Sequence, residues 1–355
     1  MNAPQRMPAL VIGGSGYVAG ELLRLLALHP RLALAAAVSD SKPGGRIAEA
    51  FPHLAVCYPD ATFIDVGGAE RLIAQLPECA VLAAGPHGVS AALLDRLLAA
   101  AAAAGTRPRV VDISADFRFA DPGAYAAVYR HEHGAPARLR DFTCAVPEHL
   151  TELTTPHVAH PGCFATAMLL AMVPLVKLGL VEPAFYVAAV TGSTGSGRTP
   201  VDGTHHPRRH SDLYAYGALA HRHAPEVVAL TRALTGTTPE LNFVPQSGPF
   251  ARGIHATLQA RLVRTASAAE VTAALREFYA GRPFVRVLED PPRLKDVVTS
   301  NFAQLACATN GRTLAVMSVL DNLTKGAAGG AVQWANRIFG WPETTGLGAP
   351  APGWT

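Results

Sequence analysis

Charged side chains are scarce in this 355-residue chain, because Asp, Glu, Lys and Arg together make up only 16% of it. The net charge is +3, and the sequence has no run of Lys or Arg. Binding to a nucleic acid or to an anionic membrane surface therefore has no electrostatic basis, and we expect neither partner. The apolar share of 49% indicates a globular protein that is long enough for two domains.

Long apolar segments and clustered cysteines are also lacking. The first eight residues show no signal-peptide pattern, and the alanine-rich stretch Ser90–Gly105 is broken by charges, which predicts a helix that does not span a membrane. The cysteines lie too far apart for a disulfide framework or for zinc spacing: Cys57, Cys79, Cys144, Cys163 and Cys307. We expect free thiols in a cytoplasmic protein. His205 and His206 have no partners at ligand spacing, so no metal site is predicted.

The chain begins with the pattern strand, glycine turn, helix. Apolar Ala9–Ile12 is followed by Gly13-Gly14-Ser15-Gly16-Tyr17-Val18, and then Glu21–Leu26 has helical spacing. Such a turn lets the backbone approach a pyrophosphate at the helix N-terminus. The spacing departs from G-x-G-x-x-G, so any tight strand–helix turn is an alternative. We predict a dinucleotide site formed by Gly13, Ser15, Gly16, Tyr17 and Val18.

The residues after the second predicted strand, Leu32–Val38, bear on the choice of cofactor. Ser39, Ser41 and Lys42, together with Arg46, could hold the 2′-phosphate of NADP, whereas Asp40 could accept a bond from the 2′-hydroxyl of NAD. The cations and hydroxyls outnumber the carboxylate, which favours NADP. The alternative is a polar surface loop.

Two more strand–helix units follow. Gly85 comes directly after the apolar run Ala80–Ala84, and Ser114 and Arg118 come after Arg109–Ile113. Alternating strands and helices predict a mostly parallel sheet, whose ligands bind at the carboxyl ends of its strands. Arg118 is therefore placed to bind a phosphate. Its alternative is a structural ion pair with Asp116 or Asp121.

The sequence His160-Pro161-Gly162-Cys163 precedes an apolar run that reads as a helix, Phe164–Val173. A thiol at a helix N-terminus lies at the positive end of the helix dipole, which favours the nucleophilic thiolate. The alternative is a buried structural cysteine.

The second half predicts strands at Phe185–Val190, Ile254–Val263 and Leu314–Leu320, and a helix at Ser267–Tyr279 with a capping box. A last helix starts near Asp321, and the tail from Pro342 is expected to be loose. The predicted fold is α/β. Residues 1–161 and 323–355 form a Rossmann-type dinucleotide-binding domain, and residues 162–322 form an α+β catalytic and substrate domain with an antiparallel sheet. Cys163 would lie at the boundary between the two domains.

Taken together, these motifs resemble the N-acetyl-gamma-glutamyl-phosphate reductase family of arginine biosynthesis, which is related to aspartate-semialdehyde dehydrogenase. The resemblance rests on seven segments in the family's order: Gly13–Tyr17 with Glu21-Leu22, Asp112–Arg118, His160–Cys163, Gly192–Arg198, His221–Glu226, Arg252–Ile254 and Asp321–Gly329.

The resemblance implies an NADPH-dependent oxidoreductase that acts on a small acyl phosphate, releases inorganic phosphate and works through a cysteine thioester. Cys163 would be the nucleophile and His221 the acid–base group, with two exposed loop histidines as the alternative reading of His221 and His223. Further cofactor contacts would come from Ser193, Gly195 and Asn322. Substrate contacts would come from Arg118, Ser114, Arg198, His223 and Arg252. We also expect a homo-oligomer, either a dimer or a tetramer.

Three other functions remain open at this point. Aspartate-semialdehyde dehydrogenase shares the thiol mechanism, but Ser114–Arg118 and His221-Arg222-His223 argue against it. A reductase of a carrier-protein-linked aminoadipyl or glutamyl phosphate is harder to exclude, although the chain has few lysines for a basic rim. A non-catalytic NADP-binding homologue would have lost the cysteine or the histidine, and both are present.

Overall fold

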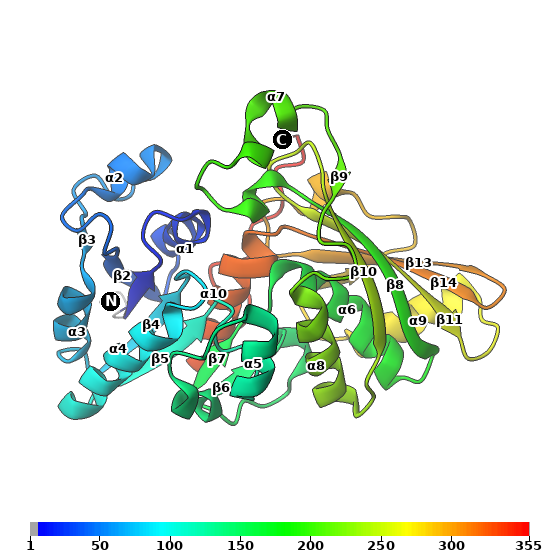
Figure 1. Cartoon of the computed structure of the whole chain (residues 1–355), viewed down its shortest axis with the longest axis horizontal. Coiled ribbons are helices and arrows are strands. Elements are labelled where there is room, and N and C mark those ends of the chain that lie inside the picture. Colours follow the sequence, from blue (N-terminus) through cyan, green and yellow to red (C-terminus); the bar gives the residue numbers. More distant parts are fainter. Residues whose placement is uncertain (1–5, 355) are drawn as a thin grey trace, which may run out of the picture. The chain divides into compact units, whose positions relative to one another are not determined.

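Seven strands, all parallel, form the sheet of the first unit in this computed structural model, which describes residues 6–354 (Figure 1). Their order across the sheet is β3-β2-β1-β4-β5-β7-β6, and the predicted parallel sheet is confirmed. The strands are β1 (Met7–Ile12), β2 (Leu32–Val38), β3 (Phe63–Ile64), β4 (Glu78–Ala83), β5 (Arg107–Asp112), β6 (Phe142–Cys144) and β7 (His157–Ala159).

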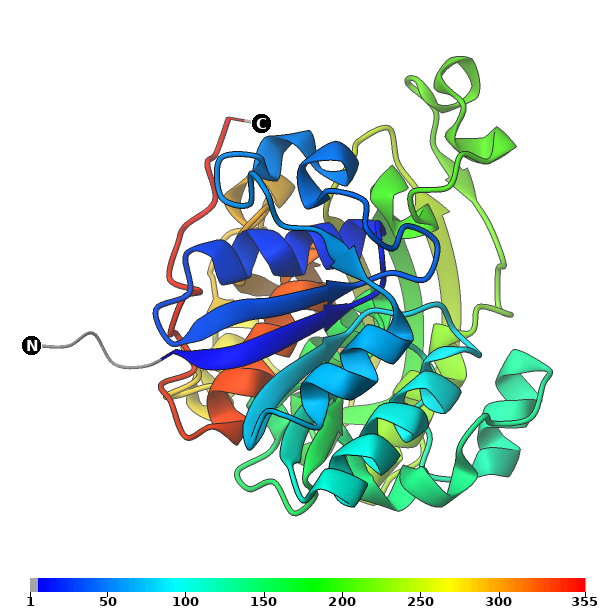
Figure 2. The ribbon, with the colours of Figure 1, turned by 90° about the vertical axis from the view of Figure 1, so that its left-hand side faces the viewer.

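Helices cover both faces of this sheet (Figure 2). Helix α1 (Tyr17–Ala27) packs beside α10 (Gly329–Ile338), and α3 (Val66–Ile73) packs beside α4 (Ser90–Ala104) on the other face. The short helices α2 (Ile47–Ala50) and α5 (Pro122–Tyr129) lie in connections. The fully buried Trp334 of α10 donates a hydrogen bond to the carbonyl of Ala145 at 3.0 Å, so the end of the chain completes a unit that begins at its start.

The tail beyond Pro342 is not loose up to Leu347, contrary to expectation. The side-chain amide of Asn336 donates to the carbonyls of Glu343 (3.0 Å) and Thr345 (2.8 Å), and Leu347 is only 3% exposed. The side-chain amide of Asn336 thus fixes the backbone of the first part of the tail through hydrogen bonds. The Gly-, Pro- and Thr-rich composition of the tail does not reveal these bonds.

The second unit is built on a sheet in the order β12-β13-β14-β11-β8-β10-β9. Antiparallel pairing was expected throughout, but β8 pairs with β10 and β12 with β13 in parallel. The long connection from β8 to β10, which contains α8 (His223–Thr235), allows the chain to return in the same direction. The strands are β8 (Val181–Thr191), β9 (Tyr214–Ala215), β10 (Glu240–Ser247), β11 (Ile254–Leu262), β12 (Val285–Val287), β13 (Ala303–Asn310) and β14 (Thr313–Leu320).

Helices α6 (Cys163–Lys177), α8 and α9 (Ala268–Phe278) pack against this second sheet. The predicted capping box of α9 is present, with Ser267 and Glu270 bonded to each other's backbone N–H. Residues of β8 alternate between a buried face, with Phe185 and Val187, and an open face, where Tyr186 is 60% exposed. A short helix α7 (His206–Arg209) lies after β8, in the histidine-rich stretch 205–223.

The packing units interleave along the chain more than the predicted domains do. Unit one contains the described residues up to Ala145 together with Glu152–His160 and Ala328–Leu347, and unit two contains Val146–Thr151, Pro161–Ala327 and the residues from Gly348 onward. Three short segments (146–151, 323–327 and 348–354) and the single residue Pro161 therefore pack outside their expected domain. Units defined by packing in the folded chain do not show which segments fold independently. The predicted domains, 1–161 with 323–355 and 162–322, therefore stay a prediction. Among residues 6–354 no helix is long and apolar enough to cross a membrane.

Candidate functional site

Cys163 is the first residue of the 15-residue helix α6, as the Pro-Gly-Cys pattern predicted. Gly162 is the N-cap and has no side chain that could bond the free N–H groups, and the first turn has no acidic residue. The helix dipole therefore acts on the thiol without competition from within its own helix. The buried carboxylate of Glu226 accepts a hydrogen bond from the Gly162 N–H at 2.7 Å and so fixes this helix start from α8.

His221 and His223 lie together beside this helix start. Their ring centroids are 4.8 Å apart, and both rings pack against Phe164, the residue after Cys163. His223 is 7% exposed and His221 is half-buried, so they are not two exposed loop histidines. The backbone N–H of His223 donates to Nδ1 of His221 at 3.2 Å, which assigns the proton of the neutral ring to Nε2. Burial, with a smaller effect of Arg222, lowers the pKa of His221 to about 4.

Tyr216 belongs to the same group, and the sequence analysis missed it. Its ring centroid lies 5.7 Å from that of His221. Burial raises the pKa of Tyr216, and the nearby Cys163 raises it further. The only sequence signal was its place in the histidine-rich stretch, which does not distinguish it from Tyr214.

Arg252 and Asn322 fix loops of the second unit. Arg252 forms a two-pronged ion pair with the fully buried Asp321, at 2.9 and 3.0 Å, and also donates to Thr324. We therefore leave Arg252 out of the proposed substrate contacts. Asn322 accepts a bond from Gly253 N–H at 2.8 Å and donates to Thr194 at 3.0 Å.

The bond from Asn322 places it beside the predicted cofactor residues Ser193 and Gly195. Both lie in the single turn Ser193–Ser196, where Thr194 receives the Asn322 amide. Arg198 is exposed, two residues after this turn. The structure thus gathers four of the predicted contacts, Ser193, Gly195, Arg198 and Asn322, around one loop of unit two.

The glycine turn of the first unit has the geometry that a dinucleotide site requires. Gly13 and Gly14 have φ angles of 135° and 58°, and a Cβ on Gly13 would lie 2.5 Å from the carbonyl oxygen of Ala84. The backbone can come this close only without a side chain. Gly16 then caps α1, which begins at Tyr17 and Val18 and points its free N–H groups toward the turn.

Ser39 lies directly beside this turn, because a Cβ on Gly14 would be 2.9 Å from its hydroxyl oxygen. The hydroxyl of Ser39 is 3.2 Å from that of Ser41. Lys42 is exposed, while Arg46 is exposed and pairs with Glu49 at 3.3 Å. The four predicted phosphate-binding residues are thus on one loop after β2.

At the end of β5, a buried polar network surrounds Ser114. The fully buried Asp112 accepts bonds from the hydroxyls of Ser114 (2.6 Å) and Ser90 (3.0 Å), and burial raises its pKa to about 6. Arg118, also buried, donates to the carbonyl of Ile113 at 2.8 Å. Of its two suggested partners, Asp116 accepts bonds from Gly88 N–H, Ala91 N–H and Tyr125, and Asp121 caps α5. Gly85 follows β4 and packs beside Ser90.

Comparisons with known proteins agree with these observations over the whole chain. Residues 8–159 match the family model "Semialdehyde dehydrogenase, NAD binding domain", and residues 163–322 match "Semialdehyde dehydrogenase, dimerisation domain". The N-acetyl-gamma-glutamyl-phosphate reductase of Ectopseudomonas mendocina is 39% identical over 95% of this chain and 96% of its own length. That of Dehalococcoides mccartyi is 37% identical over 96% and 97%.

The chain belongs to the N-acetyl-gamma-glutamyl-phosphate reductase family. In fold it is similar to aspartate semialdehyde dehydrogenase II of Vibrio cholerae, with a TM-score of 0.68 at 14% identity over 94% of this chain and 98% of that one. A probable aspartate-semialdehyde dehydrogenase of Pseudomonas aeruginosa gives 0.66 at 17% identity over 94% and 99%. At such identities the likeness concerns the fold alone.

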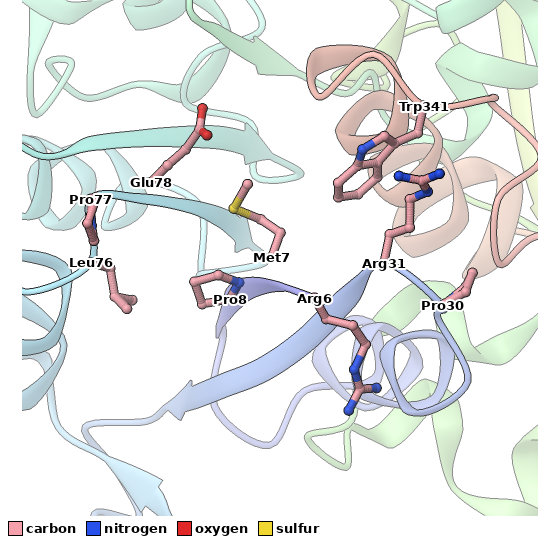
Figure 3. A pocket seen from close by; sticks show the side chains of 9 residues that line it. All are labelled: Arg6, Met7, Pro8, Pro30, Arg31, Leu76, Pro77, Glu78 and Trp341. Carbon is pink, nitrogen blue, oxygen red and sulfur yellow. The ribbon is translucent and has the colours of Figure 1, made fainter. Parts of the chain in front are cut away.

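This membership makes the first unit a nicotinamide-dinucleotide domain, since the glycine turn and Ser39 lie inside the matched range 8–159. A groove of about 390 Å³ lies away from these residues, at the amino ends of β1, β2 and β4 (Figure 3). It is lined by Arg6, Met7, Pro8, Pro30, Arg31, Leu76, Pro77, Glu78 and Trp341 and includes none of the predicted site residues. Among residues 6–354, no group of three or more His, Cys, Asp or Glu could hold a metal ion.

Proposed function

We propose that this reductase-family member converts N-acetyl-gamma-glutamyl phosphate into N-acetylglutamate semialdehyde and phosphate, in arginine biosynthesis, with NADPH as the reductant. The observation that carries the proposal is the group formed by Cys163 at the start of α6 with the neutral His221 and with Tyr216. The relatives that bear this activity's name align with nearly the entire chain.

The proposed chemistry starts at the sulfur. The thiolate of Cys163 attacks the acyl carbon of the substrate, and the carbon–oxygen bond to phosphate breaks with release of inorganic phosphate. The product is a thioester, which accepts hydride far more readily than a carboxylate does. When bound, NADPH supplies that hydride. The resulting hemithioacetal then collapses, which frees the aldehyde and restores the thiolate.

We assign the proton movements to His221. His221 is neutral at physiological pH and carries its proton on Nε2, because Nδ1 accepts the N–H of His223, so it can donate a hydrogen bond to the thiolate of Cys163. It then donates this proton to the oxygen that hydride transfer makes negative, and it takes the proton back when the hemithioacetal collapses to aldehyde and thiolate. For the substrate anion we propose Arg118, Ser114, Arg198 and His223.

A paired assay tests this function. The purified chain is given N-acetylglutamate semialdehyde or aspartate semialdehyde, and NADP reduction is followed with and without phosphate. We expect phosphate-dependent reduction with the acetylated substrate and much slower turnover with the aspartate compound. Faster turnover with aspartate semialdehyde would assign the chain to the other activity, and turnover only with a carrier-protein-linked semialdehyde would assign it to the carrier-linked reductase. No turnover with any of them would leave a non-catalytic NADP-binding homologue.

We also propose that the chain forms a dimer through the open face of the second sheet. The centre of this face is uncharged, with Tyr186, Ala188, Val244, Thr257 and Gln259 in neighbouring register positions around a hollow of about 300 Å³. The charged Glu182 and Arg261 lie toward its edge, where they pair at 3.4 Å. An uncharged centre with a polar rim is typical of a protein–protein interface. The matched family model carries the description of a dimerisation domain.

For localisation we propose the cytoplasm, because the five cysteines of this chain are free thiols, as is typical of proteins in a reducing compartment.

A further inference from the structure

Gly326 lies against the proposed nucleophile. A Cβ built on Gly326 would be 2.8 Å from the Cβ of Cys163 and 3.0 Å from its Cα. Those distances are below the contact distance of two carbon atoms, and the Cα cannot move without the start of α6. The backbone at Gly326 therefore forms one wall of the space in which the thiol stands.

The segment that carries Gly326 is an irregular turn held at its beginning by Asp321. Residues Thr324–Ala328 form a single π-helical turn, a geometry that often occurs at functional sites. The carboxylate of Asp321 accepts bonds from the N–H groups of Leu323 and Thr324, both at 2.8 Å, and its carbonyl accepts from Gly326 N–H at 2.9 Å. Arg252, which lies two residues before β11, donates to the same carboxylate and so holds Asp321 in place.

A buried ion pair holds the middle of the same turn. Lys325 donates to the carboxylate of Glu148 at 2.6 Å, and both side chains are completely buried. Such a pair contributes little net stability compared with well-packed apolar residues, because both charges lose their hydration. What it does provide is a fixed distance between two backbone segments.

The Glu148 end of this pair is itself fixed to α6. The neighbouring His149 bonds the hydroxyl of Tyr279 at 3.0 Å, and that hydroxyl donates to the carbonyl of Leu170 in α6 at 2.6 Å. Because the Tyr279 hydroxyl donates its proton to Leu170, His149 is the donor to that hydroxyl through its Nε2–H. Burial lowers the pKa of His149 to about 3, so its ring is neutral. A continuous chain of contacts thus runs from the body of α6 through Glu148 and Lys325 to Gly326, and back to Cys163 at the start of the same helix.

We propose that Gly326 and the Glu148–Lys325 pair are positioning residues, which set where the thiol of Cys163 stands. The inference rests on the proposed function in one respect, that Cys163 is the nucleophile. The pair fixes the π-helical turn relative to α6, and Gly326 leaves the space that the cysteine needs. A shift of about 1 Å in a reacting group can lower a rate about 100-fold.

Two variants test the proposal in the full chain. Gly326→Ala adds the Cβ that must displace Cys163. The double variant Glu148→Met with Lys325→Met removes both buried charges together, which avoids leaving one unpaired. Gly348→Ala is the matched control, because a Cβ there meets nothing within 4 Å. The exposed pair Arg276–Glu289, at 3.5 Å, is the control for the ion pair, as Arg276→Gln with Glu289→Gln.

The readouts are kcat, KM for NADP, the melting temperature, and the rate at which iodoacetamide alkylates Cys163, measured peptide by peptide with the exposed Cys57 as internal reference. We expect Gly326→Ala to lower both kcat and Cys163 alkylation by about 10- to 100-fold, with unchanged KM for NADP and unchanged Cys57 alkylation. The double variant should show the same pattern, and both controls should match the parent.

A folded Gly326→Ala variant with parental kcat and parental Cys163 alkylation would overturn the inference, whatever the double variant does. A lower melting temperature alone, with both rates kept, would also overturn it, because it would show a purely structural role. Slower alkylation with parental kcat would support the positioning of Cys163 and count instead against its proposed role as nucleophile.

Discussion

The carboxylate of Asp40 accepts a hydrogen bond from the backbone N–H of Val66, at 3.0 Å. Val66 is the first residue of α3, so the negative charge of Asp40 lies at a helix N-terminus, where the dipole stabilises it. In the sequence, Asp40 was the one residue that opposed a 2′-phosphate. Its engagement with α3 favours NADP, because one of its oxygens already has a partner.

We expect kcat/KM to be higher with NADP than with NAD, and neutralising Lys42 and Arg46 together to raise KM for NADP about 10-fold or more. KM for NAD should change little, because NAD lacks the 2′-phosphate. Steady-state kinetics with both cofactors measure this. Equal or higher kcat/KM with NAD in the parent chain would contradict the assignment.

Replacement of Cys163 by Ala should abolish turnover and leave cofactor binding intact, because no thioester can form. Cys307→Ala is the comparison: burial raises the pKa of Cys307 to about 11, so its thiol is protonated and unreactive. That variant should lose some stability and keep its kcat. Turnover assays and cofactor titration by fluorescence measure both, and an active Cys163→Ala protein would refute the mechanism.

Breaking the Arg252–Asp321 pair should affect stability first. Arg252→Met leaves the fully buried Asp321 without its cation, which we expect to lower the free energy of unfolding by about 3 kcal/mol. The exposed pair Arg264–Glu270 is the comparison, and we expect Arg264→Met to have a much smaller effect on stability, because solvent screens this pair. Urea unfolding gives both values. If Arg252→Met keeps the parental stability and only raises KM for the substrate, Arg252 is a substrate contact after all.

Acid should destabilise the fold through histidines that are buried in the neutral form. Burial lowers the pKa of His149 to about 3 and the pKa values of His157 and His221 to about 4. Below pH 6.5 the unfolded chain binds protons that the folded chain does not, so stability is lost as the pH falls from 6.5 toward 4. We expect His149→Gln, which keeps a donor for Tyr279, to make this loss smaller. Melting temperatures between pH 7 and pH 4 test it, and an unchanged slope would contradict the account.

The open sheet face gives a prediction about assembly. Tyr186→Glu places a carboxylate at the centre of the uncharged area, where a dimer would bury it without a partner. We expect this variant to be a monomer in analytical ultracentrifugation, whereas the parent is a dimer or a larger oligomer. Leu28→Glu, at a position that is 84% exposed in the first unit, should leave the assembly unchanged. A Tyr186→Glu protein with the parental mass would place the interface elsewhere.

Local patterns predicted the strands β1, β2, β4 and β5 of the first sheet, the start of α6 at Cys163 and the capping box at Ser267, because these depend on residues a few positions apart. The short strands β3, β6 and β7 were not predicted. The same patterns could not reveal what depends on distant partners. Asp40 meets Val66 across 26 residues and Lys325 meets Glu148 across 177. No periodicity reports such pairs, and the same holds for Arg252 and Asp321, which lie 69 residues apart. The parallel pairing of β8 and β10 could not be predicted, because the sequence analysis predicted no strand at Glu240–Ser247.

The position of α10 has a consequence for the order in which the protein can be made. The strands of the first sheet are complete by Ala159, yet α10, which packs on β4, β5 and α1, is translated more than 160 residues later. Until then the apolar surface that Ala331, Val332 and Trp334 will cover has no partner from its own chain. The core of the dinucleotide unit therefore stays incomplete while the second unit is synthesised, and it can be completed only when α10 has been translated. The last step of its folding therefore depends on contacts between segments near the two ends of the sequence, which raises the contact order of this unit.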